Sequence, residues 1–242
     1  ELRWSAHVSR DPAMMKIFRE GKIDIHTATA QALYRGNWNS LSDEKRSSLR
    51  RSAKAVNFGL LYGMTVGGFI RYAKLEYGLD LSRDEASSWV SIFFSKYFKL
   101  REYHRNIVEF CRRTGYVESP LGRRRRLPEI NSENKWLKLE AERQAINHPI
   151  QSISSDAVLI ALNEIVERRP FDIEECMPIL FVHDELVFES PEDDRVEDRA
   201  RIIKEFMENP PLDELFGVKP LVPLVAEVKV GYNLAEMEEL EL

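Results

Sequence analysis

Residues Ile179–Glu189 read ILFVHDELVFE, and this stretch gives the clearest indication of β-structure in the chain. A continuous apolar run, Ile179–Val182, is followed by the polar residues His183–Glu185, and a second apolar run occupies Leu186–Phe188. Two short apolar runs separated by a few polar residues are typical of strands joined by a tight turn. The sequence therefore predicts a β-hairpin with an acidic turn.

Outward from this hairpin, most of the chain has the periodicity of helices. A shorter hairpin is expected from Thr114 into the arginines that follow Gly122, and a last strand over residues 224–230. We expect the helix to kink or break at His148-Pro149, because proline lacks the amide hydrogen that a helix interior needs. The predicted fold class is α+β, a mostly helical block with a small antiparallel sheet. The helices are expected within residues 11–34, 42–63, 81–113, 135–166 and 196–207.

Composition limits the classes of protein to which the chain can belong. With 242 residues, 43% hydrophobic and 31% charged, it can bury a sizeable core, which excludes a disordered chain. No apolar run approaches the roughly 20 residues that cross a bilayer, so no membrane partner is expected. The two cysteines, Cys111 and Cys176, form neither a disulfide framework nor a cysteine metal cluster, which fits a reducing compartment.

The charge is unevenly distributed along the chain. A net charge of −5 argues mildly against a general nucleic-acid binder. However, Arg123–Arg126 form an unbroken basic run, whereas acidic residues gather near 191–194 and 236–239. The arginines are either ordinary loop charge or, opposite a phosphate backbone, a source of salt-dependent affinity.

Four residues with four-residue spacing lie in the predicted helix before Gly63. At about 100° per residue, Arg50, Lys54, Phe58 and Tyr62 fall on one stripe, with two cations followed by two aromatic rings. Neighbouring cations repel each other on a helix unless an anion lies between them. The stripe is therefore either a triphosphate and base-stacking surface or a solvated basic turn beside core aromatics.

The polar turn of the long hairpin carries two adjacent acids, Asp184 and Glu185. Carboxylates at a strand turn can bind Mg²⁺, which takes few carboxylates and several waters. Side chains alternate along a strand, so we expect one of the two to be the direct ligand. The alternative is an ordinary acidic turn.

A third set with four-residue spacing, Arg143, Asn147 and Gln151, occupies the predicted helix around Pro149. Arginine, asparagine and glutamine are the side chains that contact base edges and sugar oxygens in nucleic acids. The alternative is an exposed polar helix face.

Together these motifs resemble, in order and spacing, the C-terminal polymerase segment of family A DNA polymerases, the bacterial DNA polymerase I type. Arg50-x₃-Lys54-x₃-Phe58-Gly59-x₂-Tyr62-Gly63 resembles the fingers-helix motif of that family, and Phe181–Val187 resembles its palm metal motif. Gly115–Glu118 with Gly122–Arg125 resembles the stretch between them, and Asp24–Thr27 a further fingers element. The resemblance covers nearly the whole chain.

The resemblance implies a role for each matching residue at the reaction centre. Asp184 is similar to the second metal-binding aspartate and Glu185 to its auxiliary neighbour, with two Mg²⁺ ions as cofactors and Mn²⁺ as the alternative ion. Arg50 and Lys54 would hold the incoming triphosphate, and Lys54 is also the candidate proton donor to the pyrophosphate leaving group. His26 would approach the phosphates as well.

The resemblance also implies how sugar and DNA are contacted. Phe58 would stack near the sugar and base, and phenylalanine at this position goes with rejection of dideoxynucleotides in the family. Tyr62 with Glu1 would crowd the sugar 2′ position and exclude ribonucleotides. The residues implied to contact primer-template DNA are Arg143, Asn147 and Gln151 near the junction, His183 at the primer terminus, and Arg123, Arg124 and Arg125 near template or duplex phosphates.

The implied domains are palm for residues 1–22 and 133–242 and fingers for residues 23–132. Glu1–Arg3 resembles the end of the first palm motif, so its metal-binding aspartate is expected upstream of residue 1. We therefore expect an upstream polymerase segment, on the same or a separate chain, to supply that aspartate and the thumb. The implied location is the nucleoid region of a bacterial cytoplasm, or the protein is encoded by a phage.

The leading hypothesis is template-directed synthesis of DNA from dNTPs on a primer 3′-hydroxyl, in replication or repair. A non-catalytic nucleic-acid-binding module derived from a polymerase is the first alternative; Arg50, Lys54, Tyr62 and Asp184 together argue against it. A single-subunit RNA polymerase is the second alternative, and Tyr62-Gly63, Glu1 and Glu185 favour DNA synthesis over it.

Overall fold

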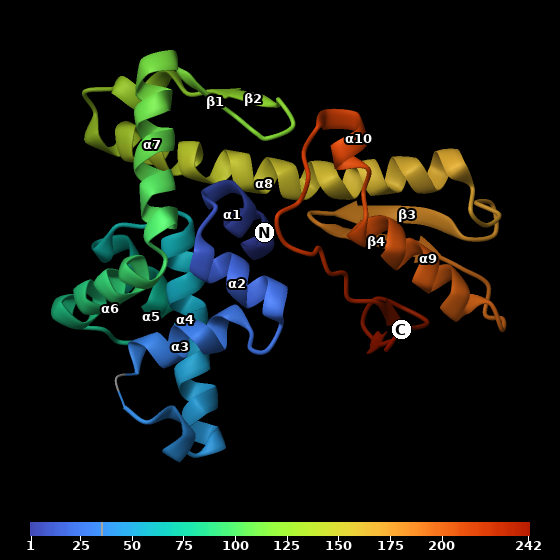
Figure 1. Ribbon diagram of the computed structural model, residues 1–242, viewed down its shortest axis with the longest axis horizontal. Helices are drawn as coiled ribbons and strands as arrows, with labels where there is room; N and C mark the ends of the chain where they lie inside the picture. Colours follow the sequence, from blue (N-terminus) through green and yellow to red (C-terminus); the bar gives the residue numbers. More distant parts are fainter. Residues whose placement is uncertain (35) are drawn as a thin grey trace. The chain divides into compact units, whose positions relative to one another are not determined.

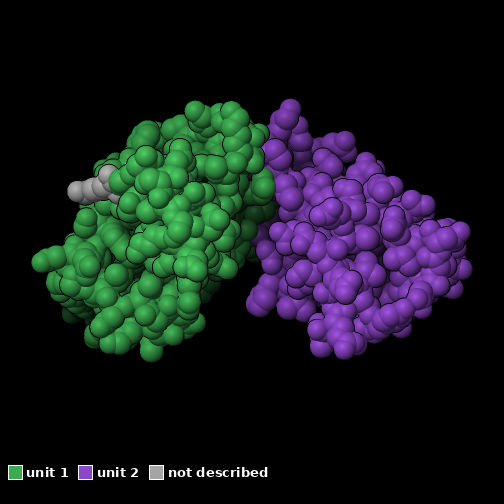
Figure 2. Space-filling view, turned by 90° about the horizontal axis from the view of Figure 1, so that it is seen from below, with its two compact units in different colours: residues 1–151 green, residues 152–242 purple. Residues whose placement is uncertain are grey.

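The computed structural model describes residues 1–34 and 36–242, and the chain divides into two compact units, residues 1–151 and 152–242 (Figure 2). Helices predominate, and the strands form small antiparallel pairs, so the predicted α+β class is confirmed (Figure 1). The elements of the first unit are α1 (Leu2–Ser9), α2 (Pro12–Glu20), α3 (Ile25–Leu33), η1 (Trp38–Ser40), α4 (Asp43–Leu61), α5 (Val66–Tyr77), α6 (Arg83–Lys96), α7 (Phe98–Thr114), β1 (Tyr116–Glu118), β2 (Arg124–Arg126) and η2 (Pro128–Asn131). The division falls within α8 (Lys135–Arg168), and the second unit continues with β3 (Met177–Val182), β4 (Glu185–Glu189), α9 (Val196–Glu208), α10 (Leu212–Phe216), β5 (Lys229–Val230) and β6 (Glu238–Glu239).

Helix α4 is central to the first unit, where it packs against α3, α5 and α6. It starts where the sequence predicts, because the Ser42 hydroxyl accepts a hydrogen bond from the Lys45 amide and Asp43 and Glu44 lie in the first turn. Its buried side consists mainly of small and apolar residues, among them Ala53, Ala55, Val56, Leu60 and Leu61. Because this side of α4 is buried, the opposite face of the helix is the one that remains accessible to solvent.

The end of α4 requires glycine. Gly63 has a φ of +71°, and a Cβ on it would lie 2.6 Å from Cδ1 of Ile146 in α8. Both the left-handed backbone and the missing side chain are therefore needed there. The Gly63 position lets the C-terminal end of α4 approach the first half of α8.

The single helix expected over 81–113 is wrong, because it breaks at Tyr97 into α6 and α7. The capping box that starts α6 at Ser82 and Glu85 is present as expected. The break follows from a distant group: the Asp11 carboxylate, fully buried, accepts from the Lys99 amide at 2.9 Å through Oδ2. Its Oδ1 accepts from the first amides of α2, so one side chain supplies caps to two helices.

The break expected at His148-Pro149 is also wrong, since α8 runs as one helix from Lys135 to Arg168 with Pro149 inside. Proline leaves a carbonyl of the preceding turn without its helical partner. That carbonyl belongs to Ala145, and the Tyr103 hydroxyl of α7 donates to the next carbonyl, that of Ile146, at 2.8 Å, which ties this turn to α7. Tertiary contacts of this kind stabilise a helix through a proline that would end an isolated one.

The arginine run forms part of the first hairpin. Strand β1 pairs with β2 in the register Tyr116↔Arg126, Val117↔Arg125 and Glu118↔Arg124, so the second strand consists of arginines. Val117 is buried, whereas the three arginines are exposed. The basic side chains are therefore presented on a short sheet that is anchored by one apolar residue.

In the second unit, β3 and β4 form the predicted hairpin, and Val182 pairs with Glu185. The turn therefore consists of His183 and Asp184 alone, and Glu185 begins β4. The strand expected over 224–230 is mostly wrong: only Lys229–Val230 pairs, with Glu238–Glu239. Among the helices that the structure describes, none is both long enough and apolar enough to cross a membrane.

A buried histidine makes the stability of the first unit dependent on pH. His104 of α7 lies 3.0 Å from the Leu61 carbonyl at the end of α4, and burial lowers its pKa to about 4 although that hydrogen bond raises it. The folded ring thus stays neutral at pH values where the unfolded chain binds a proton. Proton binding then favours the unfolded state, so the free energy of unfolding falls as pH drops through 6.5 and levels off below 4.

We expect His104 to account for a loss of up to about 3 kcal/mol between pH 7 and pH 4. The measurement is urea unfolding at a series of pH values for the wild type and for His104→Gln, whose amide can also donate to Leu61. Carboxylates that titrate in the same range contribute equally to both proteins, so the difference isolates His104. Identical pH profiles for the two proteins would contradict the expectation.

Candidate functional site

The stripe of four residues predicted on α4 lies on the open side of that helix. Arg50 and Lys54 are exposed, and Phe58 and Tyr62 are half-buried, whereas the opposite side of the helix is buried. The alternative interpretation required Phe58 and Tyr62 to be core residues. Their partial exposure shows that they are not fully buried in the core. Two cations and two accessible rings along one helix face form a surface that suits a phosphorylated aromatic ligand.

Helix α3 places His26 beside this stripe. Its ring centroid lies 5.6 Å from that of Phe58, with 42° between the planes, and its Nδ1 lies 2.8 Å from Nδ2 of Asn57. Burial, opposed by Asp24 and supported by Arg50 and Lys54, brings the pKa of His26 to about 4. At neutral pH the ring is therefore an uncharged group close enough to two cationic side chains, Arg50 and Lys54, to be affected by their charge.

Asp24 caps α3 and also holds Arg50. Its carboxylate accepts from the His26 and Thr27 amides, and the Arg50 guanidinium lies 3.2 Å from each of its oxygens. Desolvation raises the pKa of this carboxyl, but hydrogen bonds from Thr27 and Arg50 outweigh it and bring the pKa to about 2. The ion pair is half-exposed and therefore weak, so a phosphate can replace Asp24 as the partner of Arg50 at small cost.

Tyr62 and Glu1 are brought together although 61 residues separate them, since the Tyr62 hydroxyl donates to a Glu1 carboxylate oxygen. This pair lies at the aromatic end of the α4 stripe. The family resemblance implies that these two residues act jointly, and the structure gives them a direct contact within the first unit.

The acidic turn lies at the tip of the β3–β4 hairpin, where His183, Asp184 and Glu185 are all exposed. His183 has a φ of +59°, the left-handed backbone that the first residue of a two-residue hairpin turn adopts. The described residues contain no group of three or more His, Cys, Asp or Glu side chains arranged to hold a metal. Two accessible carboxylates are nevertheless the oxygen donors that Mg²⁺ takes, one or two at a time with water, so they fit as part of a site.

The arginine run contacts α8, the helix that carries the other set of predicted DNA contacts, but it does so through two residues outside that set, Gln144 and His148. Arg125 of β2 donates to Gln144 of α8 at 2.9 Å, and Nε2 of His148 lies 3.2 Å from the Arg123 carbonyl. The arginine run and α8 therefore share one surface, which the sequence does not predict. Arg124 stacks over Tyr116, with 4.9 Å between the guanidinium carbon and the ring centroid, and also pairs with Glu118.

Within the set Arg143, Asn147 and Gln151, each side chain has a different environment. Arg143 pairs with Glu140 on the exposed face, and Gln151 is exposed at the end of the first unit. Among the described residues, Oδ1 of Asn147 is the buried side-chain atom that has no hydrogen-bond partner. Asn147 thus retains an unused acceptor next to two exposed polar groups.

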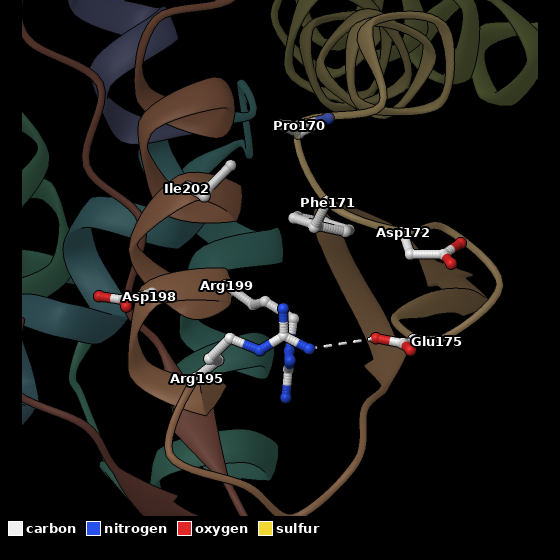
Figure 3. A pocket seen from close by; sticks show the side chains of 8 residues that line it. All are labelled: Pro170, Phe171, Asp172, Glu175, Arg195, Asp198, Arg199 and Ile202. Atoms are coloured by element: carbon white, nitrogen blue, oxygen red, sulfur yellow. Dashed lines mark hydrogen bonds and ion pairs between the residues drawn. The ribbon is translucent and has the colours of Figure 1, made fainter.

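A cavity of about 180 Å³ in the second unit is lined by none of the predicted residues (Figure 3). It lies between α9 and the segment 170–175, and Arg195 crosses it to reach Glu175 at 3.3 Å. Arg199 is paired with Asp193 at 2.5 Å. Because both guanidinium groups have carboxylate partners, the cavity offers no uncompensated positive charge to a phosphate.

Comparison with known proteins identifies the lineage. DNA polymerase family A matches residues 1–236. The chain belongs to this family. It is 39% identical to a thermostable DNA polymerase I of Thermus filiformis over 241 residues, which are 99% of this chain and 26% of the relative. It is 36% identical to a DNA polymerase I of Streptococcus pneumoniae over 96% of this chain and 24% of the relative. The chain thus spans about a quarter of the length of the curated relatives it matches.

A solved structure agrees with this assignment. The polymerase domain of Pol1 from M. smegmatis, in complex with DNA primer-template and dNTP, superposes with a TM-score of 0.75 and 30% sequence identity. The match covers 92% of this chain and 36% of that one. The predicted polymerase-type fold of this family A chain is therefore confirmed. Lys54 belongs to the first unit and Asp184 to the second, and their convergence in one cleft stays a prediction.

Proposed function

We propose that this chain is the fingers and part of the palm of a template-directed DNA polymerase that adds dNTPs to a primer 3′-hydroxyl. The observation that carries the proposal is the open face of α4, where Arg50, Lys54, Phe58 and Tyr62 are accessible beside His26. A module that only binds DNA has no need of cations and stacking rings in this arrangement. Residues 23–132 are proposed as fingers, and residues 1–22 and 133–242 as palm.

In the proposed reaction, the residues of this chain position the substrates and supply charge. Arg50 and Lys54 bind the triphosphate, and Lys54 delivers a proton to the departing pyrophosphate oxygen. Phe58 stacks on the nucleotide, and the Tyr62–Glu1 pair fills the space that a 2′-hydroxyl would need. Asp184, with Glu185 as its auxiliary, would hold Mg²⁺, which when bound in a two-ion site neutralises the triphosphate and favours ionisation of the primer hydroxyl.

We also propose that a polymerase segment outside residues 1–242 completes the palm and supplies the other metal-binding aspartate. Support comes from β3, whose apolar residues Ile179, Leu180, Phe181 and Val182 are between 37% and 46% exposed. Contiguous apolar side chains at this exposure are typical of a surface that another segment covers. The relatives, about four times as long as this chain, contain room for such a segment.

The test is primer extension by the chain together with that upstream segment, as one polypeptide or as a mixture. We expect Mg²⁺-dependent incorporation of the nucleotide complementary to the template, with dNTPs used and rNTPs rejected by a factor of at least about 100, as for other sterically filtered substrates. Preference for rNTPs would favour the single-subunit RNA polymerase. Salt-sensitive DNA binding without incorporation would favour the non-catalytic module.

A further inference from the structure

Asn57 connects the exposed ring of His26 to the interior of the first unit. Its side chain, on α4 between two positions of the open stripe, is only 1% exposed. Nδ2 lies 2.8 Å from Nδ1 of His26, and Oδ1 accepts a hydrogen bond from the Thr29 hydroxyl, also at 2.8 Å. The Thr29 oxygen is in turn 2.9 Å from the hydroxyl of Tyr97, a fully buried residue. Four side chains thus form one continuous chain of hydrogen bonds.

The Ile25 carbonyl determines which group donates and which accepts in each of these side-chain hydrogen bonds. Nδ2 of Asn57 lies 3.5 Å from the Ile25 carbonyl oxygen, which can only accept. With the amide turned over, its oxygen would face that carbonyl. The nitrogen therefore lies on the His26 side, Thr29 donates to Oδ1, and Tyr97 donates to Thr29.

This direction determines which nitrogen of His26 carries the proton. Because Asn57 donates to Nδ1, that atom must be the acceptor, and the neutral ring bears its hydrogen on Nε2. The charged groups around the ring are Asp24, the N-cap of α3, and Arg50 and Lys54 on α4. Their joint effect, with burial, keeps the ring uncharged at neutral pH.

We propose that Asn57 is a positioning residue that holds His26 as its Nε2–H tautomer, so that the ring offers a neutral donor to the phosphate oxygens of a bound nucleoside triphosphate. The nucleotide part of this inference rests on the proposed function; the tautomer does not. A neutral donor suits this place, because a third cation beside Arg50 and Lys54 would be repelled by both in the empty site. The contact with Phe58 holds the plane of the His26 ring, and the hydrogen bond from Asn57 keeps the ring proton on Nε2.

The tautomer is measured on the wild-type chain by ¹⁵N NMR with labelled histidine and asparagine, and His26 is assigned among the five histidines with His26→Gln. We expect a protonated Nε2, a bare Nδ1, and a through-hydrogen-bond coupling between Nδ1 and the side-chain nitrogen of Asn57. A proton on Nδ1 would overturn the proposal. So would a bare Nδ1 that shows no coupling to Asn57.

Asn57→Asp replaces the donor with an acceptor while keeping the shape. We expect the proton to move to Nδ1 and the pKa of His26 to rise by about one unit or more, as beside a carboxylate. Ser52→Ala is the matched control, since Ser52 is also buried on α4 and its hydroxyl donates to the Ser48 carbonyl of the same helix. An Asn57→Asp protein that retains the wild-type tautomer and titration would overturn the assignment.

The nucleotide role is tested by titrating dATP with Mg²⁺ into the chain while following the Nε2 resonance of His26. We expect this resonance to shift on binding, and the affinity to fall about tenfold in Asn57→Asp, the usual effect of losing a hydrogen bond to a charged group. If the aspartate variant does not fold, Asn57→Leu, which buries no charge, provides the same test. For this variant we expect the affinity for dATP to fall about threefold.

Two results separate this inference from the proposed function. A wild-type Nε2–H ring that does not respond to saturating dATP would overturn the nucleotide role while leaving the tautomer established. Absence of primer extension by the complete polymerase, with His26 still responding to dATP, would contradict the proposed function and support the inference. In the active polymerase, we expect Asn57→Asp to raise KM for dNTP with kcat changed less than about threefold, because the hydrogen bond is made on binding.

Discussion

Asp184→Ala is expected to lower Mg²⁺-dependent primer extension at least about 1000-fold in the completed polymerase. Asp184 is an exposed carboxylate in a two-residue turn whose backbone is fixed by the pairing of Val182 with Glu185. In the proposed function Asp184 is a metal ligand, and losing one removes several kcal/mol of transition-state charge stabilisation, with each 1.4 kcal/mol a factor of ten in rate. Single-turnover incorporation over a range of Mg²⁺ concentrations measures the effect.

The matched control for Asp184 is Glu189→Ala at the opposite end of the same hairpin, where Glu189 pairs with Met177. It removes one exposed carboxylate from β4 and is expected to change the rate less than about twofold. A folded Asp184→Ala polymerase that extends primers at the wild-type rate would remove the acidic turn from the reaction. An equal loss in Glu189→Ala would assign the effect to damage of the hairpin.

Much of this fold is visible in the sequence because its signals are local. The hairpin at Ile179–Glu189 follows from two apolar runs of strand length, and the start of α4 follows from Ser42 and the acids after it. The shared face of Arg50, Lys54, Phe58 and Tyr62 on α4 follows from four-residue spacing alone. In each case the residues that determine the structure are within a few positions of the structure they form.

The sequence predictions of secondary structure are wrong where residues far away in the sequence determine the local structure. The break at Tyr97 depends on Asp11, 88 positions before the amide that it caps, and no glycine or proline marks it. The continuity of α8 through Pro149 coincides with support from Tyr103 on another helix. The strand expected from Leu224 is cut to Lys229–Val230 because its partner, Glu238–Glu239, is only two residues long.

The candidate site shows the same division between local and distant signals. Spacing finds Arg50, Lys54, Phe58 and Tyr62, since their common face is a property of one helix. Spacing cannot find Asn57, because a polar residue in an apolar helix side becomes meaningful only when Thr29 and His26 of α3 pack against it. An asparagine among the apolar positions of the helix, next to a predicted binding stripe, is the one sequence signal that could have indicated it.

Lys54→Ala is expected to reduce kcat/KM for dNTP by about 100-fold to 1000-fold, the range for removing one donor aimed at developing charge. In the part of the chain that the structure describes, Lys54 pairs with no carboxylate, whereas Arg50 is held by Asp24. Lys54 is thus the cation of the stripe that is free to follow a triphosphate. If it also protonates the leaving pyrophosphate, kcat falls together with kcat/KM and the pH-rate profile loses its basic limb.

The control for Lys54 is Lys45→Ala, an exposed lysine in the first turns of the same helix, which is expected to leave kcat/KM within about twofold. Lys54→Arg separates the two roles of the side chain, because a guanidinium keeps the charge but does not release a proton near neutral pH. We expect this variant to recover nucleotide affinity and not kcat. Recovery of both would limit Lys54 to binding, and an unaffected Lys54→Ala enzyme would exclude the α4 stripe from the nucleotide site.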